Sequence, residues 1–195
     1  MIILGIDPGL ASTGIGVVEE SAKGGLRELH RGFVVTKAGA PMPERLRAIH
    51  DMVQDAIEKY RPDVISIESI FFAKNVRSAV LMAHGRGVAM LAAARTGVAV
   101  MEYSPLEIKQ SVVGKGRAGK DQVRQMVTML LKIQDVIGSD HEADALAAAI
   151  THAFRRKGVG AVRRAAAAAS APDSAFDERK ELLGLAMQRR RGRRR

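Results

Sequence analysis

The 195-residue chain contains no cysteine, and this absence excludes two kinds of chemistry. Without thiols there is no disulfide framework and no thiolate metal site, which suits a reducing cytosol. No apolar run approaches the roughly 20 residues that a membrane-spanning helix needs. The first apolar run is interrupted by Asp7 and has no basic leader, so we predict no secretory signal. We therefore expect a cytoplasmic protein that does not contact a membrane.

The sequence also has little net charge outside its last segment, although its formal charge is +10. Residues 155–195 hold 13 basic and 4 acidic residues, a net charge of +9, which leaves +1 for residues 1–154. A basic tail attracts any polyanion and says little about specificity. Residues 109–132 are more informative, because this segment holds six basic residues and only one acid, Asp121. Such an excess of basic residues is typical of phosphate contacts.

The apolar periodicities predict an α/β fold with five strands and five helices. Three early strands joined by short links favour an antiparallel meander, and the later alternation favours a mixed five-stranded sheet flanked by helices. We expect strands over residues 2–6, 13–20, 26–37, 63–69 and 98–101, and helices over 43–60, 75–95, from 104, 120–134 and 139–154. Residues 1–157 would form one domain, and 158–195 a basic low-complexity tail that is flexible.

Four side chains that bind metals or move protons sit where a predicted strand ends or a predicted helix begins. Asp7 ends a buried strand, where a carboxylate loses hydration that some partner must replace. Glu68 ends the fourth strand, and the two acids would be adjacent if the first and fourth strands are neighbours. His141 and Asp144 share one face of the last helix. Two divalent cations would neutralise this cluster and support phosphodiester cleavage.

Each of these residues also has a plainer interpretation. Asp7 can cap its own turn, and Glu68 can be an exposed acid at a strand end. Acids in a first helical turn are favoured by the helix dipole alone. Asp140 and Glu142, in the same turn as the predicted ligands, are interpreted as solvated residues of that kind.

The loop Gly114–Gly119 is basic and rich in glycine, and with the next two residues it nearly spells a phosphate-binding loop. The Ser or Thr that such a loop needs after its lysine is Asp121 here, and a helix, not a strand, precedes it. We interpret the loop as a clamp for the DNA backbone, with a solvated loop as the alternative.

Four stretches in the body of the chain carry a family resemblance: GIDPGLASTGIGVV at 5–18, IESIFFAKN at 67–75, VVGKGRAGKDQV at 112–123 and EADALAAAITH at 142–152. In this order they resemble the RuvC-type Holliday-junction resolvases, a branch of the ribonuclease-H-like nucleases. The resemblance spans residues 1 to about 157, nearly the whole body, and excludes the tail. It implies a ribonuclease-H-like fold.

The resemblance implies that Asp7, Glu68, His141 and Asp144 form the catalytic metal site. The commonest family pattern has Asp where this chain has His141, and imidazole suits Mn²⁺ better than Mg²⁺. Phe71 would act as a wedge near the junction centre, where a ring can stack on unpaired bases. The full set of predicted DNA-binding residues is Phe71, Phe72, Lys74, Asn75, Arg77, Lys109, Lys115, Arg117, Lys120 and Arg124.

The implied enzyme is a homodimer that nicks two strands of like polarity symmetrically at a four-way DNA junction. It would use Mg²⁺ or Mn²⁺, two ions per site, and would work with a branch-migration motor in recombination and repair. The helix over 75–95 is the expected dimer interface, because Gly85 and Gly87 indicate close helix packing. Two alternatives stay open: a junction-binding protein without catalysis, and a fragment of an actin- or sugar-kinase-type ATPase.

Overall fold

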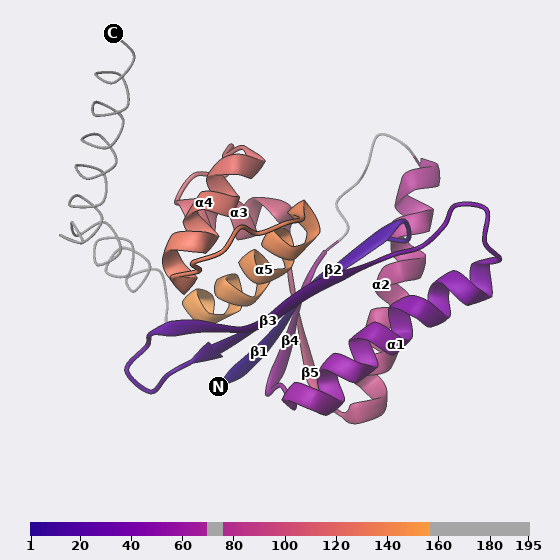
Figure 1. Cartoon of the computed structure of the whole chain (residues 1–195), viewed down its shortest axis with the longest axis horizontal. Helices are drawn as coiled ribbons and strands as arrows, with labels where there is room; N and C mark the ends of the chain where they lie inside the picture. The colour runs from indigo at the N-terminus through magenta and orange to yellow at the C-terminus, as the bar shows by residue number, and fades with distance from the viewer. Residues whose placement is uncertain (70–75, 157–195) are drawn as a thin grey trace, which may run out of the picture. The chain divides into compact units, whose positions relative to one another are not determined.

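The computed structural model describes residues 1–69 and 76–156, with the side chains at 76–78 left aside (Figure 1). Its centre is a five-stranded sheet in the order β3-β2-β1-β4-β5. The strands are β1 (Ile2–Asp7), β2 (Ser12–Glu20), β3 (Leu26–Val35), β4 (Val64–Glu68) and β5 (Ala99–Tyr103). The first three strands pair antiparallel, and β4 and β5 run parallel to β1. This confirms the predicted meander and the mixed sheet.

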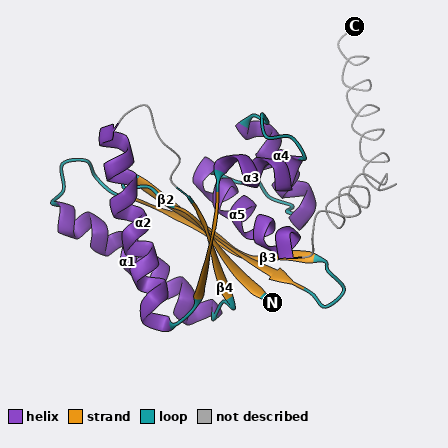
Figure 2. Cartoon of the chain, turned by 180° about the vertical axis from the view of Figure 1, so that it is seen from behind, coloured by secondary structure: helices purple, strands orange, loops and turns teal. Residues whose placement is uncertain are grey.

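Helices cover both faces of the sheet, as the two opposite views show (Figures 1 and 2). The helices are α1 (Met42–Tyr60), α2 (Val76–Thr96), α3 (Pro105–Val113), α4 (Lys120–Leu131) and α5 (Asp140–Arg156). α1 and α2 lie together on one face, whereas α5 lies against β1 and β2 on the other, with α3 and α4 beside it. Neither layer contains a helix, within residues 1–69 and 76–156, that is long and apolar enough to cross a membrane.

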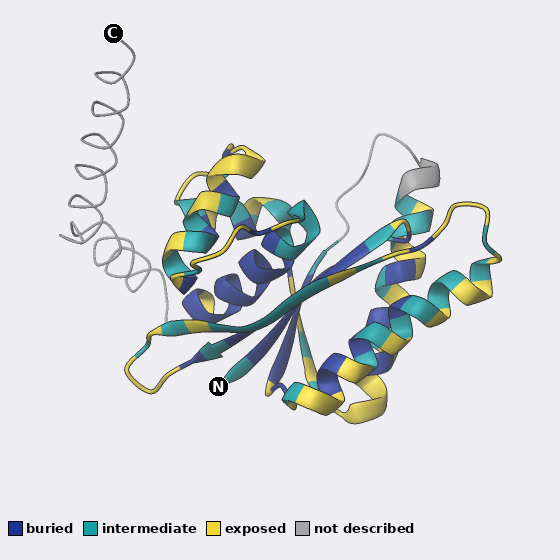
Figure 3. Ribbon diagram, in the orientation of Figure 1, coloured by how far each residue is buried: buried dark blue, intermediate teal, exposed yellow. Residues whose placement is uncertain are grey.

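Helix α5 lies unusually close to the sheet because small residues face each other across the contact. A Cβ added at Gly5 of β1 would fall 1.9 Å from the Ala145 carbonyl oxygen. A Cβ at Gly14 of β2 would fall 2.1 Å from the His141 carbonyl oxygen. α5 is the most continuously buried helix, and Leu146 and Ile150 are fully buried (Figure 3). Glycine on the strands and alanine on the helix therefore fix the position of α5.

The predicted helix starts are correct, and one predicted end is wrong. Ser104 and Glu107 form a reciprocal capping box at α3. At α5, Glu142 accepts from the Ser139 N–H at 3.1 Å, while the Ser139 hydroxyl accepts from His141 N–H. α4 ends at Leu131 and not at 134, because Lys132 adopts a left-handed conformation with φ of 54°. No glycine marks that end, so the sequence pattern carried no stop signal.

The two glycines of α2 behave differently from each other. A Cβ at Gly85 would lie 3.1 Å from the Gly9 backbone, so this glycine packs against the loop after β1 and not against a helix. Gly87 has no atom of the described residues within 4 Å of that position. Only Gly85 is therefore explained by packing within the chain.

The remaining predictions about chain organisation fall outside the described residues. Residues 157–195 include the whole predicted tail, so the boundary at 157 and the flexibility of the tail stay predictions.

Candidate active site

The carboxyl ends of β1 and β4 bring the first two predicted acids together. Ile6 pairs with Ile67 in the parallel ladder, so Asp7 and Glu68 follow on neighbouring strands. Besides burial, the negative charge of Asp7 is one of the causes that raise the pKa of Glu68. Asp7 is only 9% exposed. The prediction that the first and fourth strands are neighbours is therefore confirmed.

Helix α5 adds His141 from the opposite layer. Because Gly14 has no side chain, the first turn of α5 sits directly over the end of the β1–β2 ladder. The His141 imidazole then donates from Nδ1 to Oδ2 of Asp7 at 2.7 Å. This hydrogen bond raises the pKa of His141 above its ordinary value, against the effect of burial. The hydrogen bond therefore favours the protonated form of His141 beside Asp7.

The site holds more negative charge than its surroundings neutralise. Burial raises the pKa of Glu68 to about 7, with further contributions from the charges of Asp7 and Asp144. Burial likewise raises the pKa of Asp144 to about 6, and the Asp7 charge adds to this. Lys120, whose Nζ lies 4.0 Å from Asp144, opposes the effect only in part. Such repulsion between buried carboxylates is typical of a site that takes up cations.

The donor set fits a hard divalent cation. Three carboxylates and one imidazole match the ligands that Mg²⁺ and Mn²⁺ accept. Among residues 1–69 and 76–156, however, no three His, Asp or Glu side chains converge into a closed metal cage. The hydrogen bond between His141 and Asp7 occupies atoms that both residues would offer to an ion. The ligands are thus collected at one edge of the sheet but are not in a coordinating arrangement.

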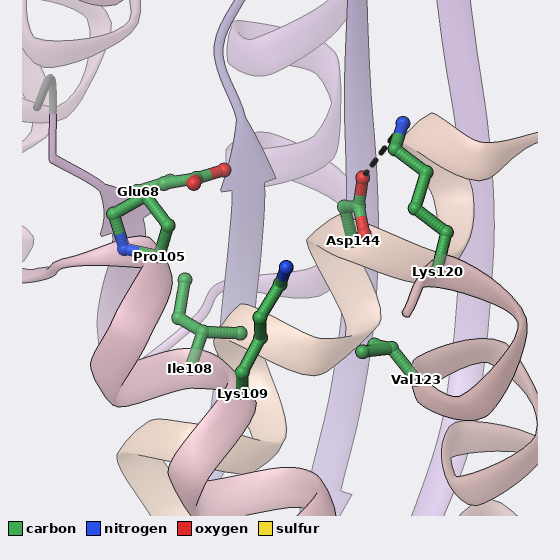
Figure 4. A pocket seen from close by; sticks show the side chains of 7 residues that line it. All are labelled: Glu68, Pro105, Ile108, Lys109, Lys120, Val123 and Asp144. Atoms are coloured by element: carbon green, nitrogen blue, oxygen red, sulfur yellow. Dashed lines mark ion pairs between the residues drawn. The ribbon is translucent and has the colours of Figure 1, made fainter. Parts of the chain in front are cut away.

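A pocket of about 270 Å³ opens beside these acids (Figure 4). Its charged walls are Glu68 from β4, Asp144 from α5, Lys109 from α3 and Lys120 from α4. Both lysine side chains extend toward the acids. Pro105, Ile108 and Val123 form the apolar part of the lining. This pocket places two lysine ammonium groups next to two carboxylates.

The structure separates the predicted DNA-binding residues into groups. Lys109 and Lys120 line the pocket, whereas Lys115 and Arg117 are exposed on the loop between α3 and α4. Arg124 pairs with Asp140 and not with the pocket acids. The others lie outside the described residues: Phe71, Phe72, Lys74, Asn75 and the side chain of Arg77.

Asp140 and Glu142 lie in the first turn of α5 and are partly exposed, as predicted, and each also makes a specific contact. Glu142 caps α5 through the Ser139 N–H, as the capping-box spacing itself indicated. Asp140 forms ion pairs with both Lys120 and Arg124. One feature of the sequence pointed to these ion pairs. The segment 109–132 has few acids, so its basic side chains need acidic partners from other elements.

The sequence comparisons identify a family. The family model described as crossover junction endodeoxyribonuclease RuvC matches residues 3–152. The enzyme of that name from Ruminiclostridium cellulolyticum is 48% identical over 152 residues, covering 78% of this chain and 91% of that protein. The one from Brevibacillus brevis is 47% identical over 153 residues, with 78% and 92% covered.

Solved structures agree with the sequence comparisons. Thermus thermophilus RuvC superposes with a TM-score of 0.74 at 36% identity, covering 80% of this chain and 96% of that one. The same protein in complex with a Holliday junction substrate gives a TM-score of 0.75 at 36% identity, with 80% and 95% covered. The predicted ribonuclease-H-like fold is thereby confirmed. Matched over most of its length by sequence and by structure, the chain belongs to the RuvC family of crossover junction endodeoxyribonucleases.

Proposed function

We propose that this protein resolves four-way DNA junctions by nicking two strands of like polarity symmetrically, in recombination and repair of DNA in the cytoplasm. The observation that carries the proposal is the pocket in which Glu68 and Asp144 face Lys109 and Lys120. Acids alone would repel a phosphodiester, and lysines alone would only bind it. Together they form a site that can grip a DNA backbone next to ligands for a divalent cation.

We further propose that Asp7, Glu68, Asp144 and His141 hold the divalent cations, two per site. Bound cations would supply an activated water and charge stabilisation for the leaving oxygen. Lys109 and Lys120 orient the phosphate at the mouth of the pocket. His141 would hold a cation through a ring nitrogen once its hydrogen bond to Asp7 is broken.

We assign a preference for Mn²⁺ over Mg²⁺ to His141. Imidazole is a softer ligand than carboxylate, and Mn²⁺ accepts nitrogen more readily than Mg²⁺ does. The position of the ring is supported by its 2.7 Å contact with Asp7, which places it at the edge of the acidic cluster.

We propose that the active unit is a homodimer formed through α2. An exposed stripe with the spacing of a helix-pairing seam runs along this helix: Val80, His84, Gly87, Leu91 and Ala94. Val80 and Leu91 are 50% and 55% exposed, and Gly87 would allow a second helix to approach closely. A two-fold dimer matches the two-fold symmetry of a four-way junction. The branch-migration motor implied by the family resemblance is proposed as a further partner.

The test compares a synthetic four-way junction with a linear duplex of the same arm sequence, each with Mn²⁺ and Mg²⁺. We expect paired nicks at symmetric positions in the junction only, with ends that ligase can seal. Equal cutting of the duplex would contradict structure selectivity. Binding of the junction without cleavage in either ion would favour the alternative of a non-catalytic junction-binding protein. The ATPase alternative is excluded by family membership.

A further inference from the structure

Asp140, in the first turn of α5, forms ion pairs with two basic side chains of α4. Lys120 and Arg124 are four residues apart on α4, so their side chains lie on one face of the helix. The Asp140 carboxylate contacts the Lys120 Nζ through Oδ2 at 3.3 Å and the Arg124 guanidinium through Oδ1. Asp140 therefore occupies the position between two cations that a DNA phosphate oxygen would take.

The Lys120 ammonium lies between two carboxylates, Asp140 and Asp144, and Asp140 makes the shorter contact. Its Nζ reaches 4.0 Å from Asp144 at the rim of the pocket (Figure 4). The Lys120 side chain is 64% exposed, so little packing holds it there. Repulsion from the Arg124 charge on the same face would drive it away unless a negative group lay between the two. Asp140 supplies that group from outside the catalytic set.

Stability alone does not explain this arrangement. The Asp140 side chain is 39% exposed, and exposed ion pairs contribute little to folding free energy. The positional consequence is larger, because a reacting group displaced by about 1 Å can cost up to about a hundredfold in rate. The placement of Lys120 is thus the property that Asp140 controls most strongly.

We propose that Asp140 is a positioning residue that holds Lys120 at the pocket rim. When the junction binds, the ion pair between Asp140 and Arg124 breaks, and Arg124 binds the DNA backbone instead. The inference rests on the proposed nuclease function. It predicts an unusual combination in Asp140→Asn. Removal of a negative charge from a phosphate-binding surface leaves DNA affinity unchanged or increases it, whereas the misplaced Lys120 slows cleavage.

The experiment measures junction affinity without divalent ions and single-turnover cleavage at saturating enzyme with Mn²⁺. For Asp140→Asn we expect a dissociation constant no larger than that of the wild type. We expect its cleavage rate to be reduced about 5- to 20-fold. Asp140→Glu should restore most of the rate, because its carboxylate can still reach both cations. Asp121→Asn is the matched control: it removes an exposed acid beside Lys120 that has no ion pair among the described residues, and both values should stay at wild-type levels.

A double-mutant comparison separates positioning from a general structural effect. In a Lys120→Ala background, Asp140→Asn should cause no further loss of rate, since the residue acts through Lys120. A wild-type cleavage rate in Asp140→Asn would overturn the proposal. Weakened DNA binding together with a lowered melting temperature, or an equal loss in the Lys120→Ala background, would overturn it as well. If the wild-type protein cuts no junction, the proposed function fails, and not this inference alone.

Discussion

At the scale of single residues, the raised pKa of Glu68 lowers the stability of the folded protein near neutral pH. Its carboxyl group is surrounded by apolar strand ends and by the charges of Asp7 and Asp144, and these raise its pKa to about 7. The folded protein therefore holds a proton that the unfolded chain has already lost above its ordinary value of 4.5. Stability consequently falls as the pH rises from 4.5 through about 7.

We predict that Glu68→Gln raises the melting temperature of the metal-free protein at pH 8. The amide keeps the shape of the acid but removes the repulsion from Asp7 and Asp144. At pH 4, where the wild-type acid is protonated, the two proteins should melt within about one degree of each other. Thermal melts in EDTA at both pH values check this. An equal difference at pH 4 and pH 8 would show that repulsion is not the cause.

His141 gives a prediction about ion choice. His141→Asp replaces the imidazole with a fourth carboxylate ligand, so the ratio of the Mg²⁺ rate to the Mn²⁺ rate should rise several-fold. Junction cleavage at matched ion concentrations measures the ratio. Equal wild-type rates with both ions, unchanged in the variant, would refute the assignment. His50→Asp, at a partly exposed position of α1 remote in the sequence from the acids, serves as a control for the substitution itself.

The sequence predicted which acids lie together at the sheet edge better than it predicted the contacts of their neighbours. Asp7 and Glu68 could be placed together because both end buried runs on strands that can pair. Asp140 could not be placed, because its partners lie on another helix and no periodicity reports contacts between helices. The segment around Phe71 lies outside the described residues, so its proposed wedge role stays a prediction.

At the scale of elements, the contact of α5 with β1 and β2 determines the site. The closeness of this contact follows from Gly5 and Gly14, which lie beneath the helix and leave no room for a side chain. Nearly all strands and helices were predicted because their apolar periods differ clearly. The end of α4 was missed because Lys132 turns the chain without glycine.

We predict that Gly5→Ala lowers the free energy of unfolding by about 3 kcal/mol, because the new methyl group would overlap the backbone of α5. The rigid helix backbone cannot move aside as a flexible side chain would. Urea denaturation measures the change. Gly39→Ala is the matched control: its Cβ would meet no atom of the described residues within 4 Å, and its stability should change by less than about 1 kcal/mol. Similar stability of the two variants would contradict the close approach of α5.

At the scale of the whole molecule, the exposed stripe on α2 gives the proposed dimer a test. Leu91→Glu places a charge in the centre of the stripe, so we expect a monomer in analytical ultracentrifugation with an unchanged circular dichroism spectrum. A monomer would lose paired nicking. Val35→Glu, at a 66% exposed position of β3, should remain dimeric. If the Leu91→Glu protein stayed dimeric, the dimer interface would not lie on this stripe of α2.

We propose that the acids at the carboxyl ends of β1 and β4 hold the cations that hydrolyse junction DNA. The most direct test uses Asp7→Asn, which keeps the shape of the ligand beside His141 and Glu68 but removes its charge. Asp55→Asn, an exposed acid of α1, is the control. We predict that Asp7→Asn binds a four-way junction as tightly as wild type but does not cut it with Mn²⁺ or Mg²⁺, while Asp55→Asn cuts normally. Cleavage by Asp7→Asn at the wild-type rate would contradict the account.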